Sequence, residues 1–142
     1  NMIGEGRDGG DKGEYSAIFY KSEKLRLEKA ETFWLSESPE VPSIGWDAAL
    51  NRITTVGVFS DVSSNKEFIV YNSHFDHIGK IARENSVNVI LNHIRENNYI
   101  KNRISTKHSD ISLIRATLLL FKTAFNSTNF NSFWANETYF LG

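Results

Sequence analysis

Two histidines and an aspartate follow a strand-like apolar run near the middle of the sequence. The segment NSHFDHIG, residues 72–79, contains His74, Asp76 and His77 and comes directly after the apolar residues 67–71. Histidine titrates near neutral pH, carboxylates bind hard cations, and the end of a strand holds side chains at fixed positions. The segment therefore predicts chemistry on a phosphate group or at a metal ion. The alternative is that one histidine packs against a turn while the other is solvated.

The composition limits the chain to one core and to a few kinds of partner. The 142 residues are 40% hydrophobic, which suits one domain. Sixteen basic and seventeen acidic residues give a net charge of -1, so a nucleic acid would need a local cleft to bind. Because the chain has no cysteine, disulfides, thiolate metal sites and cysteine nucleophiles are excluded. No apolar stretch approaches ~18 residues, so we expect no membrane span. The compartment stays open, and the protein could be cytoplasmic or exported.

The first third of the chain predicts a loop followed by strands. Residues 1–14 hold five of the nine glycines and predict a mobile loop. Residues 15–29 alternate apolar and polar side chains on both sides of a polar triplet, which predicts a hairpin that turns at 21–23. Residues 32–35 are apolar and predict a further short strand.

The centre of the chain predicts a sheet covered by a helix. Residues 52–59 are rich in threonine and valine and predict a strand whose antiparallel partner is residues 67–71. Residues 80–97 change to a helical period, and residues 111–125 fit either a second helix or a buried strand followed by a turn. The apolar residues of the predicted helix are Ile81, Val87, Val89, Ile90, Leu91 and Ile94. This order of elements favours an α+β fold with a mostly antiparallel mixed sheet.

Three blocks of sequence, in this order and at this spacing, resemble the endonuclease/exonuclease/phosphatase superfamily, which has a deoxyribonuclease-like fold. The similarity is greatest to the bacterial hydrolases of that superfamily. The blocks are GRD at 6–8 with GEYSAIFY at 13–20, TFWLSE at 32–37 with GWDAALNRI at 45–53, and NSHFDH at 72–77. The resemblance implies that residues 1–142 form a single partial domain, part of a four-layered α/β sandwich. It also implies hydrolysis of phosphodiesters or phosphomonoesters with Mg²⁺ or Mn²⁺.

The same resemblance implies roles for individual residues. His74 matches the histidine of the family's Asn-Thr-His block, which contacts the scissile phosphate, and Asn72 and His77 are further candidates for phosphate contacts. Arg52 matches an arginine that points into the cleft and suits planar contact with phosphate oxygens. Its alternative is an ordinary ion pair with an acidic residue. Asp76 is a catalytic candidate that would orient a histidine or lie near the metal, although a cap on the following helix is a simpler interpretation.

Several other side chains are predicted to be structural. Glu14 and Asp47 are expected to order loops. Four aromatic residues are expected to pack in the core or the cleft wall, and two histidines are expected on the surface. These are Trp34, Trp46, Phe19 and Phe33, and His93 and His108, respectively.

The chain departs from the family pattern where the metal ligands should be. The first strands, with their Asn and metal-binding Glu, and the terminal Ser-Asp-His have no counterpart in this sequence. An ungapped continuation places residues 103–106 (RIST) at the family's Gly-Asp-Phe-Asn block, and a rival alignment sets residues 109–111 (SDI) against Ser-Asp-His. Isoleucine neither binds a metal nor positions water. The metal ligands in this chain are therefore unknown.

Two interpretations of function follow. In the first, the chain is part of a metal-dependent phosphohydrolase. In the second, it is catalytically inactive and keeps the fold for binding or for work with a partner. The loop at 36–45 carries Glu37 and Glu40 without a basic cluster, which favours a small phosphate ester over a long nucleic acid. Open sheet edges would also favour a homo-oligomer or a complementing chain.

Overall fold

The computed structural model describes residues 1–97 and the backbone of residues 117–119. Its elements are β1 (Met2–Ile3), β2 (Ile18–Phe19), β3 (Leu25–Trp34), β4 (Ile53–Asp61), β5 (Glu67–Ser73), α1 (Lys80–Glu96) and β6 (Thr117–Leu119). The predicted features at 103–106, 109–111 and His108 lie outside the described residues. None of the described helices is long and apolar enough to cross a membrane.

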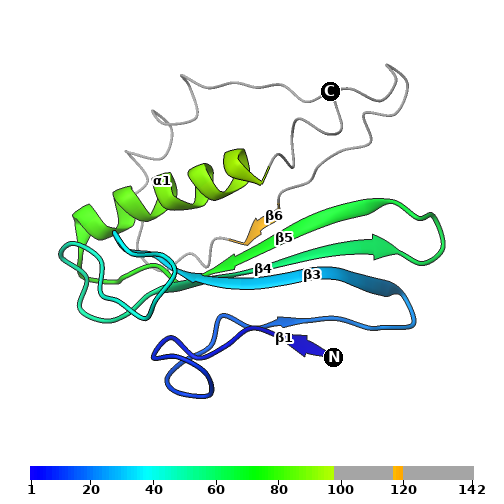
Figure 1. Cartoon of the computed structure of the whole chain (residues 1–142), viewed down its shortest axis with the longest axis horizontal. Helices are drawn as coiled ribbons and strands as arrows, with labels where there is room; N and C mark the ends of the chain where they lie inside the picture. Colours follow the sequence, from blue (N-terminus) through cyan, green and yellow to red (C-terminus); the bar gives the residue numbers. More distant parts are fainter. Residues whose placement is uncertain (98–116, 120–142) are drawn as a thin grey trace.

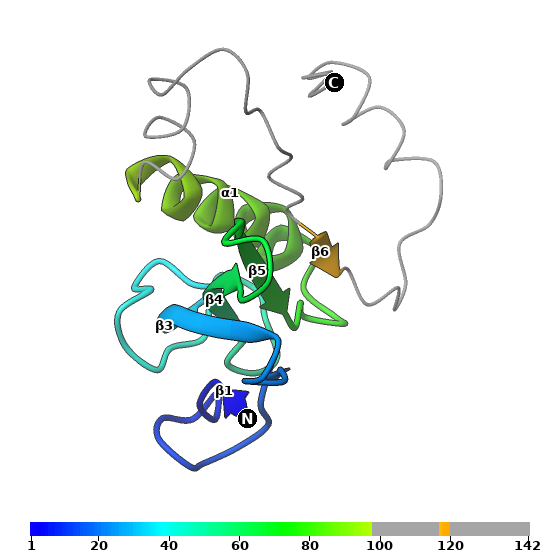
Figure 2. The same ribbon diagram turned by 90° about the vertical axis from the view of Figure 1, so that its right-hand side faces the viewer.

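The described elements form three layers. Strands β3, β4, β5 and β6 make one sheet in that order, antiparallel except for the parallel pair of β5 and β6. Helix α1 covers one face of this sheet, and the short antiparallel ribbon of β1 and β2 lies on the other (Figure 1). The turned view in Figure 2 keeps the same order of layers. The predicted α+β class with mostly antiparallel strands is confirmed.

Strand β4 is the centre of the fold because both of its faces are covered. Seven of its nine residues are buried. On the helix side, Val56 joins Tyr71 and Ile90 in the hydrophobic core, together with Phe33, Leu35 and Ile69. On the ribbon side, a side chain at Gly57 would collide with Ile3 and with the ring of Phe59, so glycine allows close packing there. The predicted strand pair of β4 and β5 is confirmed.

The predicted hairpin at 15–29 is wrong. β2 pairs with β1, in the register Met2 with Phe19 and Ile3 with Ile18, and not with the strand that follows it. The turn after Lys21 exists, but it carries the chain from the ribbon to the main sheet. There β3 runs as one ten-residue strand through residues 25–34, where the pattern predicts two pieces. A bulge between Leu27 and Lys29 interrupts the alternation of apolar and polar residues, so the sequence pattern does not indicate that the strand is continuous.

The segment 1–14, predicted to be a mobile loop, contains regular contacts in addition to turns. Besides β1, the segment contains a bridge between Gly6 and Tyr15 and several backbone hydrogen bonds, among them Asp8 N to Lys12 O at 3.0 Å. A side chain at Gly6 would collide with the Lys12 carbonyl group, and Gly13 has φ +80°. The glycines at these positions therefore permit a tight turn that other residues would strain.

Helix α1 is confirmed, and of its predicted apolar residues Ile90 is buried in the core while Val89 and Ile94 are partly buried against it. Its buried side chains are Ala82, Ser86 and Ile90, spaced four residues apart, whereas Ile81 is 54% exposed. The hydroxyl group of the buried Ser86 donates to the carbonyl oxygen of Ala82 at 2.6 Å, so its polar atom is satisfied within the helix. Among the aromatic residues predicted to pack, Phe33 and Trp34 are buried, but Phe19 is 76% exposed on the ribbon.

His93 on the same helix is not a surface residue, contrary to the prediction. Its side chain is only 12% exposed, and its ring stacks on Phe33 with centroids 4.6 Å apart. Its Nδ1 atom lies 3.1 Å from the Tyr71 hydroxyl group, and its Nε2 atom lies 3.3 Å from Glu31 Oε1. His93 therefore helps to fix the helix on the sheet.

For the segment 111–125, the structure describes three residues as strand β6, whose backbone pairs with Val70, Tyr71 and Asn72. At these positions the strand alternative holds and the helix alternative does not.

Replacing Ile90 with alanine should destabilise the fold by about 3 kcal/mol, because it removes the main apolar contact of α1 and leaves a cavity in the core. Urea denaturation followed by circular dichroism measures this change. The exposed Ile81 is the matched control, and its replacement by alanine should change the unfolding free energy by less than about 0.5 kcal/mol. Equal losses for the two variants would contradict the packing described above.

Candidate functional site

The pairing of β4 with β5 brings the candidate residues together. Arg52 directly precedes β4, and His74 directly follows β5. Because the two strands are antiparallel, with Thr54 opposite Ser73, the start of one meets the end of the other. The backbone of His74 continues this ladder by donating from its N–H to the carbonyl oxygen of Ile53 at 3.1 Å.

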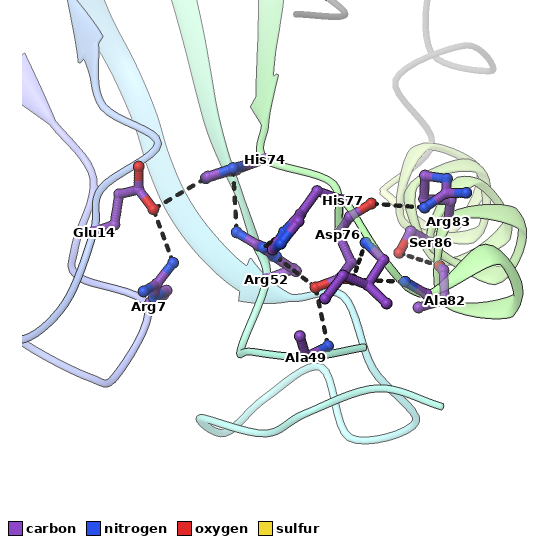
Figure 3. A network of polar contacts seen from close by, with 12 residues as sticks. Arg7, Glu14, Ala49, Arg52, His74, Asp76, His77, Ala82, Arg83 and Ser86 are labelled. Atoms are coloured by element: carbon purple, nitrogen blue, oxygen red, sulfur yellow. Dashed lines mark hydrogen bonds and ion pairs between the residues drawn. The ribbon is translucent and has the colours of Figure 1, made fainter. Parts of the chain in front are cut away.

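Arg52 is the centre of the resulting polar cluster (Figure 3). Its side chain is 3% exposed, and all three of its nitrogen atoms have partners. Nε donates to Asp76 Oδ2 at 3.0 Å, Nη1 lies 3.1 Å from His74 Nε2, and Nη2 lies 2.9 Å from His77 Nδ1. The structure thus joins four of the five predicted site residues through one guanidinium group.

The guanidinium group also selects the tautomer of both imidazole rings. Arginine has only donors, so His74 Nε2 and His77 Nδ1 must each accept a hydrogen bond. The remaining proton is then on Nδ1 of His74 and on Nε2 of His77. Burial and the positive charge of Arg52 lower the pKa of His74, which is consistent with a neutral ring.

Asp76 is buried and every contact that it makes is with a hydrogen-bond donor. Its Oδ1 accepts from the N–H groups of Ile78 and Gly79 at 2.8 and 2.7 Å, and its Oδ2 accepts from Arg52 and from Ala49 N. Burial alone would raise the pKa of Asp76, but the backbone hydrogen bonds and Arg52 outweigh it and hold the pKa well below its usual range. Asp76 therefore positions Arg52 and orders the turn before α1.

The first turn of α1 takes its cap from a distant carboxylate. Asp47 accepts hydrogen bonds from Ile81 N at 3.3 Å and from Ala82 N at 2.7 Å. These contacts satisfy backbone donors that have no partner within the helix, and they lower the pKa of Asp47. The predicted structural role of Asp47 agrees with this geometry.

Asn72 does not join the cluster. Its amide nitrogen donates to the carbonyl oxygen of Ala17 at 2.9 Å and so ties β5 to the N-terminal segment. Because side chains along β5 alternate between the two faces of the sheet, Asn72 lies on the ribbon side, where it is paired with Thr55 of β4.

The structure adds two residues that the sequence-based assignment of the site did not include. Glu14 Oε2 lies 2.8 Å from Arg7 Nη1 and 3.5 Å from His74 Nδ1, at the edge of the cluster (Figure 3). Both residues belong to blocks that carry the family resemblance, but the glycine-rich composition of the segment suggested mobility. Their flanking glycines, which make a tight turn possible, were the available signal.

The described side chains do not fit a magnesium or manganese site. Within residues 1–97, no group of three or more His, Asp or Glu side chains gathers closely enough to hold a metal ion. Asp76 accepts from N–H donors at both oxygens, and the cluster contains the cationic Arg52 and Arg7. A hard cation needs several oxygen ligands, which these groups do not offer.

Comparisons with known proteins identify relatives of this part of the chain. No family model matches the chain. An uncharacterized protein of Acanthamoeba polyphaga mimivirus is 39% identical over 62 residues, which are 42% of this chain and 23% of that protein.

Solved structures give longer matches. An endonuclease/exonuclease/phosphatase family protein from Bacteroides thetaiotaomicron is 47% identical with a TM-score of 0.67, over 69% of this chain and 36% of its own. A mannosyl-6-phosphatase from the same organism is 48% identical with a TM-score of 0.69, over 72% of this chain and 39% of its own. An endonuclease/exonuclease/phosphatase from Bacteroides vulgatus is 43% identical with a TM-score of 0.66, over 68% of this chain and 38% of its own. The predicted resemblance to this family is confirmed, and the chain spans well under half the length of these proteins.

Replacing Asp76 with asparagine should destabilise the fold by about 3 kcal/mol near neutral pH, because it leaves the buried Arg52 without its counter-charge. The folded-state pKa of Asp76 is depressed, so its contribution is present above the unfolded pKa of about 4 and is lost as the pH falls further. Urea denaturation between pH 2 and pH 7 should therefore give a flatter pH dependence for Asp76→Asn than for the unmodified chain. Parallel pH curves for the two would contradict this role.

The pKa of His74 should lie below its ordinary value of about 6.5. Removing the charge of Glu14 and removing the charge of Arg7 should shift this pKa in opposite directions. Glu14→Gln removes a negative charge that favours the protonated ring and should lower the pKa further, whereas Arg7→Gln should raise it. Side-chain NMR titration of the histidines measures both shifts. The exposed Glu84→Gln is the control, and a His74 pKa that moves equally in this variant would rule out the described contacts.

Proposed function

We propose that this chain, which resembles part of the endonuclease/exonuclease/phosphatase family proteins, carries the phosphate-binding groups of a phosphate-ester hydrolase. The observation that supports this most is the buried Arg52, which is fixed by Asp76 and contacts two partly exposed imidazole rings. In this proposal the described layers are part of a four-layered sandwich: α1 is one outer layer, the main sheet is the first inner layer, and the ribbon of β1 and β2 belongs to the second sheet.

The geometry suits the stabilisation of a phosphoryl group. Because Arg52 donates to one nitrogen of each ring, it polarises the N–H group on the opposite side of that ring. The Nδ1–H group of His74 and the Nε2–H group of His77 then become donors backed by a buried positive charge. Fixed donors of this kind favour the negative charge that develops on phosphoryl oxygens during hydrolysis and need no reorganisation at that moment. Asp76 acts through Arg52 and is a positioning residue.

The family resemblance implies that Mg²⁺ or Mn²⁺ would supply charge neutralisation at the phosphate. Since the described residues do not fit such an ion, its ligands would come from outside residues 1–97. The roles proposed for Arg52, His74 and His77 concern only the binding and orientation of the phosphate group.

The proposed substrate is a small phosphate ester. One similar protein is a mannosyl-6-phosphatase, which makes a phosphorylated sugar a reasonable first candidate. The net charge of -1 and the acidic Glu37 and Glu40 of the 36–45 loop are unfavourable to a long polyanion.

The alternative is a module that binds phosphate esters without hydrolysing them. It is favoured by the same donor set, since the cluster holds donors for a phosphate, while its two carboxylates, Asp76 and Glu14, are each already paired with an arginine. The two functions share the site and differ only in turnover.

Hydrolysis of a panel that includes mannose 6-phosphate and a generic phosphodiester, measured with Mg²⁺ and with Mn²⁺, tests the proposal. His74→Ala should lower kcat/KM by roughly 10²-fold or more, because it removes a donor to the developing charge. Lys80→Ala, an exposed change on α1, is the control and should leave the rate unchanged.

Metal-dependent turnover that falls in His74→Ala would support the hydrolase. Turnover that is equal in the unmodified chain and in His74→Ala would contradict it. Phosphate binding that requires His74, without turnover of any substrate, would replace the hydrolase with the binding module.

A further inference from the structure

Two carboxylates join the 45–51 loop to the start of α1, one from each side. Asp76, in the turn before the helix, accepts a hydrogen bond from Ala49 N of the loop at 3.1 Å (Figure 3). Asp47, in the loop, accepts from two backbone N–H groups of the helix, the closer being Ala82 N at 2.7 Å. The loop and the helix are therefore held together by hydrogen bonds that run in both directions.

The loop and the helix approach each other so closely that glycine is needed between them. A side-chain carbon at Gly79 would lie 2.7 Å from the backbone oxygen of Asp47 and 2.7 Å from its Oδ1 atom. Gly79 is the N-cap residue of α1 and has no capping side chain, and the first turn of the helix contains no acidic residue. Because a helix N-terminus favours an acceptor with negative charge, Asp47 supplies from the loop what the helix itself lacks.

The backbone of the loop is strained at the residue before Asp47. Trp46 has φ +47°, a left-handed conformation that bulky side chains rarely adopt. A side chain at Gly45 would collide with the carbonyl oxygen of Leu35, so the turn starts in close contact with the end of β3. Trp46 N then donates to Glu37 Oε2 at 3.3 Å. A strained residue persists where its surroundings enforce it, and strain of this kind gathers at functional sites.

Both elements lead directly into the polar cluster around Arg52. The loop is followed at once by Arg52, and His77 lies between Asp76 and the first turn of α1. His77 Nδ1 is 2.9 Å from Arg52 Nη2, so this contact joins the loop side of the cluster to the helix side. In the described part of the chain, the Asp47 carboxylate bonds to backbone N–H groups and to neither partner of that contact.

Resting on the proposed phosphate-ester function, we propose that Asp47 is a positioning residue of the phosphate site, which locks the 45–51 loop onto α1 and so keeps His77 against Arg52. With Asp47 in place, Asp76 bonds to the loop and to the helix turn at the same time. Without Asp47, the hydrogen bonds of Asp76 have to hold the two elements alone, and His77 can turn away from the guanidinium group. His77 then serves as a phosphate donor only while Asp47 caps the helix.

Side-chain NMR of the histidines, with inorganic phosphate titrated into the full chain, tests this role. Asp47→Ala should move the ring signals of His77 in the free protein and weaken phosphate binding roughly fivefold, the equilibrium value of a typical helix cap. Asp47→Asn keeps an acceptor for Ala82 N and should restore most of both losses.

Gly79→Ala is an independent variant that leaves Asp47 unchanged. Its φ of -65° and ψ of 109° suit alanine, so its effect would come from the added methyl group, which pushes the loop away from the helix. It should therefore shift the His77 signals and weaken phosphate binding as Asp47→Ala does.

Ile90→Ala is the control for a general loss of stability. It destabilises the same helix from the core, by at least as much as the loss of a cap. Because Ile90 lies outside the loop and the polar cluster, the folded variant should keep the His77 signals and the phosphate affinity of the unmodified chain.

The outcomes separate this inference from the proposed function. Shifted His77 signals and weaker binding in Asp47→Ala and Gly79→Ala, but not in Ile90→Ala, would support the positioning role. Unchanged His77 signals in Asp47→Ala, or an equal shift in Ile90→Ala, would overturn it, and the proposed function would stand if His74→Ala still abolished phosphate binding. Shifted His77 signals in Asp47→Ala, with phosphate binding that does not depend on His74, would support the structural coupling and overturn the phosphate function.

Discussion

The buried ion pair of Arg52 and Asp76 is the interaction on which the rest of this structure depends. It joins the residue before β4 to the turn before α1, and Asp76 also binds the backbone of the 45–51 loop through Ala49. Two desolvated charges are costly, and the cost is offset only where further hydrogen bonds satisfy the remaining atoms. Three backbone N–H groups provide these bonds on Asp76, and two imidazole nitrogens provide them on Arg52. The same contacts that make the pair tolerable also fix both histidines.

Sheet pairing provides the frame for this cluster. Arg52 and His74 are 22 residues apart, yet the antiparallel register of β4 and β5 makes them neighbours. The last pair of that ladder is held by the hydroxyl groups of Thr54 and Ser73, 2.8 Å apart and buried. Packing of Val56, Tyr71 and Ile90 holds α1 against the same strands. Hydrophobic packing thus sets the positions, and the polar network sets the orientations.

The sequence predicts the elements whose pattern is local and fails where distant contacts decide. β4, β5 and α1 are recognisable because the residue types and apolar periods of their own segments suit a strand or a helix. Arg52 and His74 are recognisable because they stand at strand ends and match family blocks. The pairing of β2 depends on Met2 and Ile3, far away in sequence, so the hairpin prediction has no local means of being corrected. Likewise, the order of the glycine-rich segment comes from Trp34 and Asn51, which bind the Arg7 carbonyl group.

Ile81 shows the same limit within a helix. The helical period predicts that Ile81 lies on the apolar face, but the buried face of α1 follows Ala82, Ser86 and Ile90, and Ile81 is left exposed. Asp76 is an example of the same limit within the site. A carboxylate is a suitable metal ligand, but in the fold the Asp76 carboxylate accepts hydrogen bonds from Arg52 and from backbone N–H groups. A carboxylate committed to holding a guanidinium group cannot also hold a hard cation. Among the described residues, Asp76 therefore serves to hold Arg52 and the turn before α1, and it does not take part in a group of side chains that could hold a metal ion.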